Sequence, residues 1–363
     1  MRTLLILLAA TTALAQTAPQ TRISRITENL RGVSAVSQKV AWASGTHGSY
    51  LRTTDGRIWI PDQVPGAETL DFRGVVAFSA EEAFLMSSGP GDHSRIYHTA
   101  DAGRHWQLQF TNTNGKGFFD SMVFWDRTHG IVLGDPIPDT AGIPKFELLM
   151  TDDGQTWTAI PPAQLPAALE GEAAFAASNS CLAILKAPVT PSVPEETNPN
   201  IWFASGGKAA RVFHSPDRGK TWEVFDTPIT HGTDSAGIFS IAFRDATQGV
   251  IAGGDYKLPE QDGPNLAFTD DGGKTWTLSK IFPQSYYSAA VYDHKSKPGN
   301  SNEEARDRIF LVGPKFIYDF RPPKNPTRIS AKKKSDSEFN AVSAYPQGGA
   351  LVVGPKGVII NVP

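Results

Sequence analysis

The chain has 363 residues and a formal net charge of −3, and charged residues make up 20% of it. It lacks the excess of lysine and arginine that nucleic-acid binders carry, so no nucleic-acid partner is predicted. The single cysteine, Cys181, excludes an intramolecular disulfide and a cysteine-based zinc site. The eight histidines show no metal-ligand spacing, so no metal is predicted.

The first fifteen residues are typical of a signal peptide. Arg2 precedes an apolar run from Leu4 to Ala10, and the small residues Ala13-Leu14-Ala15 form a cleavage site. The apolar run is shorter than the roughly 20 residues that a transmembrane helix needs, and no later stretch reaches that length. We therefore expect cleavage after Ala15, no membrane span, and a protein that is secreted or periplasmic.

One tryptophan-containing pattern repeats along the chain. The copies share Ser/Thr-x-Asp-x-Gly-x-x-Trp or a close variant, and the full copies recur at intervals of roughly 50–65 residues with no helical periodicity between them. In chain order they are the short copy Thr53-Asp55-Gly56-Trp59 and the full copies Thr99-Asp101-Gly103-Trp106, Met150-Asp152-Gly154-Trp157, Ser215-Asp217-Gly219-Trp222 and Thr269-Asp271-Gly273-Trp276. This repeat length predicts β-propeller blades, each a four-stranded sheet.

The repeated residues suit a β-hairpin turn. Aspartate can accept hydrogen bonds from the backbone amides of the turn, glycine supplies a positive φ, and tryptophan leads the next strand into an apolar layer. We therefore predict a structural and non-catalytic role for Asp55, Asp101, Asp152, Asp217, Asp271, Trp59, Trp106, Trp157, Trp222 and Trp276.

Short β-rich runs separated by turn residues precede each of these turns. They predict an all-β fold, a single seven-bladed propeller over residues 16–363, with blades that start near residues 32, 74, 119, 172, 237, 287 and 339. The last unit contains only three strands. We expect Ile23–Leu30 to be its fourth strand, so that an N-terminal strand closes the ring and removes an exposed edge.

Three segments resemble a known group of propellers. They are Gly130–Pro136 (GIVLGDP), Ala210–Trp222 (ARVFHSPDRGKTW) and Thr269–Trp276 (TDDGGKTW). They are similar to Asp-box (BNR-type) propellers and, more narrowly, to exported bacterial relatives of the photosystem II stability/assembly factor. The resemblance implies Asp-box turns on one face of the propeller. It also implies that ligands bind on the opposite face, around the mouth of the central channel.

Charged residues are expected at this channel mouth. Aligning the starts of the inner strands gives one residue for each blade, namely Arg31, Arg73, Asp120, Glu172, Phe239, Tyr287 and Phe339. Unpaired charge is costly in a narrow, partly desolvated channel, so two interpretations stay open. In the first, the two arginines pair with the two carboxylates. In the second, these four residues form a ligand-binding surface, flanked by Asp135, Arg211, Asp255 and Tyr256.

Three functions remain. The favoured hypothesis is a non-catalytic, monomeric propeller without a cofactor, which binds a partner protein or a small polar ligand over the channel mouth, as an assembly or stability factor would. The first alternative is a glycoside hydrolase of sialidase type, with an arginine cluster and a Tyr287–Glu172 pair. The second alternative is an oxidoreductase with an unrecognised cofactor such as a quinone, because no dinucleotide-binding or haem motif is present.

Overall fold

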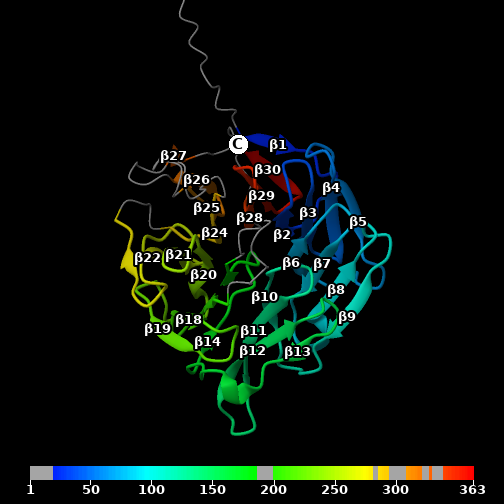
Figure 1. The fold of residues 1–363 in the computed structure, drawn as a ribbon. Coiled ribbons are helices and arrows are strands. Elements are labelled where there is room, and N and C mark those ends of the chain that lie inside the picture. The colour runs from blue at the N-terminus through cyan, green and yellow to red at the C-terminus, as the bar shows by residue number, and fades with distance from the viewer. Residues whose placement is uncertain (1–18, 186–198, 281–284, 294–307, 321–326, 329–337) are drawn as a thin grey trace, which may run out of the picture.

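In the computed structural model, seven β-sheets surround a common centre and form a seven-bladed β-propeller (Figure 1). The structure describes residues 19–185, 199–280, 285–293, 308–320, 327–328 and 338–363. Within these ranges the helices are two short 3₁₀ turns, Gly91–His93 and Pro162–Gln164, and no helix has the length and apolarity to cross a bilayer. The predicted signal peptide, residues 1–15, lies outside the described residues.

Each blade is an antiparallel sheet, and its strands follow one another from the centre of the ring to the outside. Blades 1 to 3 consist of β2 (Leu30–Ala35), β3 (Ala41–Gly45), β4 (Ser49–Thr53) and β5 (Ile60–Gln63); β6 (Phe72–Ala77), β7 (Ala83–Ser87), β8 (Arg95–Thr99) and β9 (Gln107–Thr111); and β10 (Phe119–Phe124), β11 (Gly130–Pro138), β12 (Pro144–Thr151) and β13 (Thr158–Ala159). Blades 4 and 5 consist of β15 (Leu182–Ile184), β16 (Ile201–Ala204), β18 (Arg211–Ser215) and β19 (Glu223–Asp226); and β20 (Ala236–Phe243), β21 (Gly249–Asp255), β22 (Leu266–Thr269) and β23 (Thr277–Leu278). Blades 6 and 7 consist of β24 (Ala289–Tyr292), β25 (Ile309–Gly313), β26 (Phe316–Phe320) and β27 (Thr327–Arg328); and β28 (Ala341–Ala344), β29 (Ala350–Gly354), β30 (Val358–Val362) and β1 (Gln20–Arg22).

An N-terminal strand closes the ring, as predicted. β1 pairs with β30, the last strand of the chain, and Figure 1 shows the two side by side. The closing strand is Gln20–Arg22, however, and the prediction of Ile23–Leu30 was wrong. Arg25 has a φ of 58°, which interrupts an extended strand, and Leu30 is fully buried as the first residue of β2.

The hydrophobic core lies between neighbouring blades. In each of blades 1 to 5, the tryptophan of the predicted turn packs against the blade that precedes it in the ring. Trp59 contacts the cluster of blade 7, and Trp106 lies edge-on to Trp42 and Tyr50 of blade 1. Trp157, Trp222 and Trp276 occupy the same place in blades 3, 4 and 5.

Five turns have an aspartate that accepts hydrogen bonds from the turn backbone. In blades 2, 4 and 5 the carboxylates of Asp101, Asp217 and Asp271 accept the amide four residues later. In blades 1 and 3 the turn is one residue shorter, and the accepted amide lies three residues later.

In blade 3 the accepting carboxylate is that of Asp153. It accepts the Thr151 hydroxyl and the amides of Gln155 and Thr156. Asp152 was therefore the wrong member of the Asp152-Asp153 pair. In all five turns the accepting aspartate lies two residues after the serine or threonine that donates to it, and in blade 3 that residue is Thr151.

Blade 4 begins about ten residues later than the predicted start near residue 172. The two-residue strand β14 (Glu172–Ala173) pairs with β17 (Gly206–Gly207), which in turn pairs with Gly237 of blade 5. The inner strand of blade 4 is β15, whose first residue is Leu182. The chain between β14 and β15 belongs to neither strand, and it lies in the centre of the ring.

Candidate functional site

β-Bulges position the predicted mouth residues in blades 1, 2, 3 and 5. The pairing between first and second strands skips one residue of the first strand, and the skipped residue is Arg31, Arg73, Asp120 or Phe239. A bulge re-aims the side chain that it leaves unpaired. The same backbone device therefore directs two arginines, an aspartate and a phenylalanine toward the centre.

In blades 6 and 7 the equivalent residues lie one position later than predicted. Ala289 pairs with Val312, and Ala341 pairs with Val353, so Ser288 and Asn340 take the position of Arg31. Tyr287 is fully buried in the cluster between blades 5 and 6. The sequence signal for this position is a large apolar residue, any residue and a small residue, as in Leu30-Arg31-Gly32 and Phe119-Asp120-Ser121.

The channel contains the segment that precedes blade 4, residues 174–180, here called the central segment. Asn179 bonds through its side chain to both the amide and the carbonyl of Met122 in blade 3. Ser178 donates to the carbonyl of Ser288 in blade 6. Phe175 stacks on Phe239 of blade 5, with 4.0 Å between the ring centroids. The central segment thus connects blades that are not neighbours.

The two mouth arginines also bind the central segment. The carbonyl of Ala176 accepts hydrogen bonds from Arg31 Nη2 at 3.4 Å and from Arg73 Nη1 at 3.2 Å. Arg73 Nε also donates to Asp71 Oδ2 at 2.7 Å. The first interpretation, in which Arg31 and Arg73 pair with Glu172 and Asp120, is therefore wrong for the described residues: Arg73 pairs with Asp71, and both arginines donate to a backbone carbonyl.

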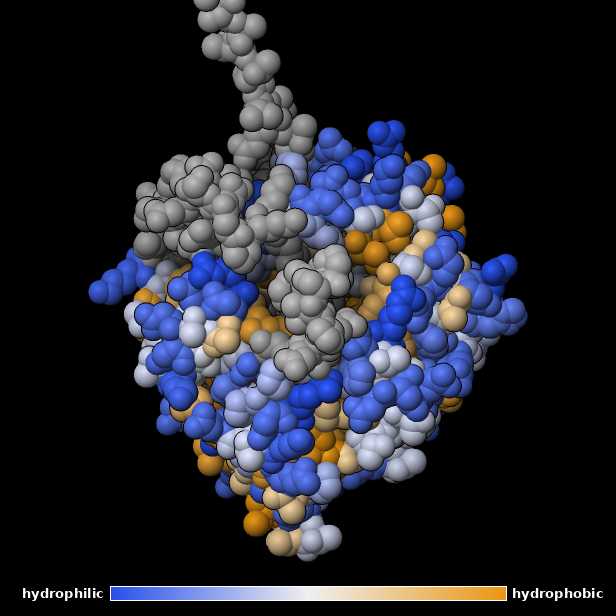
Figure 2. All heavy atoms as spheres, in the orientation of Figure 1, coloured by the Kyte–Doolittle hydropathy of each residue, from blue (hydrophilic) through white to orange (hydrophobic). Residues whose placement is uncertain are grey.

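Above the central segment is a cavity of about 550 Å³, here called the mouth pocket. Its polar lining includes Arg31, Arg73, Asp120, Asp135 and Asn340. Its aromatic lining comprises Phe118, Phe175, Phe239, Tyr256, Tyr286 and Phe339. Hydrophilic side chains cover most of the outer rim of the molecular face drawn in Figure 2.

Two polar groups of the mouth pocket are buried without a hydrogen-bond partner among the described residues. They are Asp120 Oδ2 and Arg31 Nε. Asp120 is only 1% exposed, and burial together with the nearby charge of Asp135 raises its pKa well above the usual range. Burial and the repulsion of Arg73 lower the pKa of Arg31. A buried polar group without a hydrogen-bond partner destabilises the fold, and a bound molecule that supplies the hydrogen bond removes this penalty.

Asp135 is a second carboxyl group of the mouth pocket. It follows Gly134 at a bulge in β11, and its Oδ1 accepts the amide of Ala174 at 2.9 Å. Burial raises the pKa of Asp135 to about 6, although the Ala174 amide acts in the opposite direction. Asp135 thus both positions the start of the central segment and can change its charge near neutral pH.

Glu172 and Arg211 lie together, but they do not line the mouth pocket. Arg211 donates two hydrogen bonds to the carboxylate of Glu172, whose side chain is fully buried. The Ser205 hydroxyl and the Leu169 amide also bond to this carboxylate. Because all four bonds lie at β14, the pair anchors the start of the central segment.

The remaining two predicted site residues differ from each other. Tyr256 lines the mouth pocket, is 47% exposed and meets Phe239 edge-on. Asp255 does not line the pocket, and its carboxylate accepts the amide of Lys257 and the hydroxyl of Thr233. Asp255 therefore shapes a turn.

The residues that sequence reasoning missed belong mainly to the central segment. Ala176 and Phe175 carry no motif, and the large-apolar, any, small pattern does not single them out, because both Leu169-Glu170-Gly171 and Phe175-Ala176-Ala177 fit it.

The constellation expected of a sialidase-type enzyme is not assembled. Tyr287 is in the core, and both carboxylate oxygens of Glu172 are occupied by Arg211 and neighbouring groups. In the part of the chain that the structure describes, no group of three histidine, cysteine, aspartate or glutamate residues could hold a metal ion. Cys181 is buried and unpaired.

Solved structures of propellers are similar to this chain. One, described as YCF48 bound to D1 peptide, has a TM-score of 0.62 and 15% identity over 98% of this chain and 99% of that chain. The WD40 propeller domain of Doa1 has a TM-score of 0.59 and 11% identity over 94% of both chains. The GH74 xyloglucanase from Xanthomonas campestris has a TM-score of 0.59 and 14% identity over 94% of this chain and 53% of that chain. At these identities the likeness shows the fold alone.

No protein-family model matches the chain, and a comparison with curated proteins finds no match.

Proposed function

We propose that this chain is an exported propeller of the Asp-box type that binds a segment of a partner protein in the mouth pocket. The observation that carries the proposal is the pair of buried, unpartnered polar groups, Arg31 Nε and Asp120 Oδ2, in the lining of a single cavity. A structural ion pair would leave neither of them without a partner. A partner segment would satisfy both on binding.

The lining defines the chemistry of this segment. Arg31 and Arg73 offer donors to a carbonyl or carboxylate oxygen, and Asp120, whose pKa burial raises well above the usual range, offers an acceptor and, when protonated, a hydroxyl donor. The aromatic lining offers apolar area beside these groups. An extended peptide, with alternating backbone polar groups and side chains, meets both requirements.

A structural neighbour supports the choice of a protein partner. The structure described as YCF48 bound to D1 peptide is a propeller that covers 98% of this chain and holds a peptide. The xyloglucanase neighbour has the same fold, so the fold alone does not decide between binding and hydrolysis. The orphaned groups and the unassembled sialidase constellation together favour binding.

Photo-crosslinking in the producing cell tests this proposal. A photoreactive amino acid at Tyr256, on the rim of the mouth pocket, should form an adduct with a partner protein. The matched control is Leu108 on β9, which is similarly exposed at 46% and lies on an outer strand. The adduct at Tyr256 should disappear when Arg31→Ala is added. Equal adducts at both positions, or an adduct that survives Arg31→Ala, would contradict the proposal.

Export has its own test. The protein purified from the envelope or the medium should begin at Gln16, as measured by mass spectrometry of the intact chain. Recovery of a chain that begins at Met1 would reject the predicted cleavage.

A further inference from the structure

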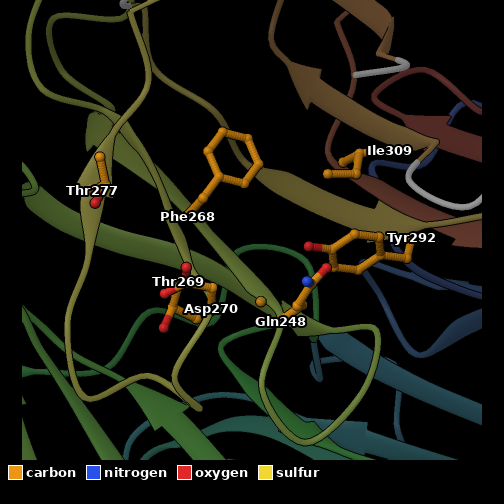
Figure 3. Close-up of a pocket in the computed structure, with 8 residues that line it drawn as sticks. Gln248, Phe268, Thr269, Asp270, Thr277, Tyr292 and Ile309 are labelled. Carbon is orange, nitrogen blue, oxygen red and sulfur yellow. The ribbon is translucent and has the colours of Figure 1, made fainter. Parts of the chain in front are cut away.

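A second cavity, of about 280 Å³, lies between blades 5 and 6, and it is here called the inter-blade slot. Figure 3 shows Phe268, Thr269, Asp270 and Thr277 of blade 5 on one side and Tyr292 and Ile309 of blade 6 on the other. None of these residues lines the mouth pocket. The slot is thus a separate feature of the fold.

The slot lies where other blades insert a tryptophan. Blades 1 to 5 each pack a turn tryptophan against the preceding blade, as Trp276 of blade 5 packs in the cluster that contains Trp202 of blade 4. Trp276 is the last tryptophan in the sequence, so blade 6 has none to offer blade 5. The register confirms the equivalence, because Tyr292 takes the place in blade 6 that Phe243, a neighbour of Trp276, takes in blade 5.

The second strand of blade 5 offers no ring to this interface either. One register position in the second strands is aromatic in blades 1, 2, 4 and 6 and aliphatic in blades 3, 5 and 7, where it holds Ile131, Val250 and Leu351. Phe320 packs against Phe268 with 6.1 Å between ring centroids, yet the cavity remains. Among the described residues, this interface thus lacks the two indole rings that Trp202 and Trp276 bring to the interface between blades 4 and 5.

We propose that the inter-blade slot is a binding site for a small planar aromatic molecule of the indole class. The rings of Phe268 and Tyr292 and the side chain of Ile309 provide apolar contacts. The Thr277 hydroxyl and the Asp270 carboxylate provide acceptors for a ring N–H. In the interface between blades 4 and 5 the indole N–H of Trp276 has an acceptor too, the carbonyl of Gly273 at 3.0 Å, whereas those of Trp59 and Trp106 have none among the described residues.

Calorimetry with indole tests the site, using the full mature chain. We expect one equivalent of indole to bind and to raise the melting temperature, because a ligand of the folded state stabilises it. Cyclohexanol, which has no planar ring and no N–H, should bind at least tenfold more weakly. Val250→Phe should abolish indole binding by filling the slot, and the equivalent position in blade 2 already holds Phe84. No heat of binding, or indole binding that survives Val250→Phe, would overturn the proposal.

Two further measurements keep the test decisive if Val250→Phe does not fold. Trp276→Ala should open a matching slot between blades 4 and 5, so this variant should bind a second equivalent of indole. A crystal soaked with 5-bromoindole should show anomalous bromine density between blades 5 and 6. Density elsewhere only would reject the site. Arg31→Ala should leave indole binding unchanged, so a failure here is independent of the mouth pocket.

Discussion

The two ends of the blades use aspartate in opposite ways. In the turns, the His105 side chain and amide at Asp101, and backbone and hydroxyl donors at Asp153 and Asp271, hold the pKa of these carboxylates at about 2. In the mouth pocket, burial raises the pKa of Asp135 to about 6 and that of Asp120 well above the usual range. Turn carboxylates thus stabilise the fold, whereas the mouth carboxyl groups are kept at a cost to it. Groups that destabilise the fold and lie together in one cavity are typical of a binding site.

The largest expected effect on stability comes from Glu172. The alignment of inner-strand starts placed it at the position that Asp120 has in blade 3. Glu172→Gln should destabilise the fold by about 3–5 kcal/mol, because it leaves Arg211 buried without a compensating charge. Urea denaturation measures this change. The control is Glu260→Gln, which removes an exposed partner of Lys315 and should leave stability almost unchanged, because exposed ion pairs are screened by solvent. Equal effects would show that Glu172 does not anchor the central segment.

Removal of the Asn179 side chain tests the other end of the central segment. Asn179→Ala should cost about 1–3 kcal/mol, since it strands the amide and carbonyl of Met122. Asn179 also has a φ of 58°, a conformation that alanine adopts less readily. Hydrogen exchange should become faster at Met122. An unchanged exchange rate there would mean that the central segment is held by other contacts.

The pH dependence of stability separates the two kinds of aspartate. The pKa of Asp135 is raised in the folded state, so folding takes up a proton between about pH 6 and pH 4, and stability should rise by about 1 kcal/mol between pH 7.5 and pH 5. The pKa of Asp271 is lowered, so its contribution should be lost only as the pH falls from about 4 toward 2.

Denaturation of wild type and Asp135→Asn at pH 7.5 and pH 5 checks this assignment. The variant should lose most of the gain at pH 5. The same gain in both proteins would rule out Asp135 as its source.

The smallest expected effect concerns a single turn. Asp217→Ala should lower stability by about 1 kcal/mol, through the loss of its bonds to Thr221 and Ser215. Adducts at Tyr256 should be unaffected, because the turn does not line the mouth pocket. A folded Asp217→Ala protein that no longer forms the adduct would contradict the assignment of the turns to stability and of the mouth pocket to binding.

The repeats allowed most of the fold to be predicted from the sequence. Turn residues and tryptophans at regular intervals report blades because each blade needs a turn of the same chemistry. The missing fourth strand of blade 7 likewise required an N-terminal strand. The predicted position of this strand was wrong because Gln20–Arg22 is short and polar, whereas Ile23–Leu30 contains more apolar residues.

The candidate site was harder to predict because it depends on a departure from the repeat. Arg31, Arg73 and Asp120 were found because their blades obey the common alignment. Glu172 was misassigned because blade 4 starts at Leu182 and its preceding residues enter the channel. The choice of Asp152 over Asp153 failed for a local reason, since either spacing of the turn fits the sequence.

The stability of Asp120→Asn at pH 7.5 tests the central claim most directly. Asp120 is buried, its Oδ2 has no partner among the described residues, and its pKa is raised. If the mouth pocket is held for a ligand at a cost to folding, the neutral isostere should unfold at an equal or higher urea concentration than wild type. A clear loss of stability would mean that the Asp120 carboxyl supports the fold, and it would contradict the account.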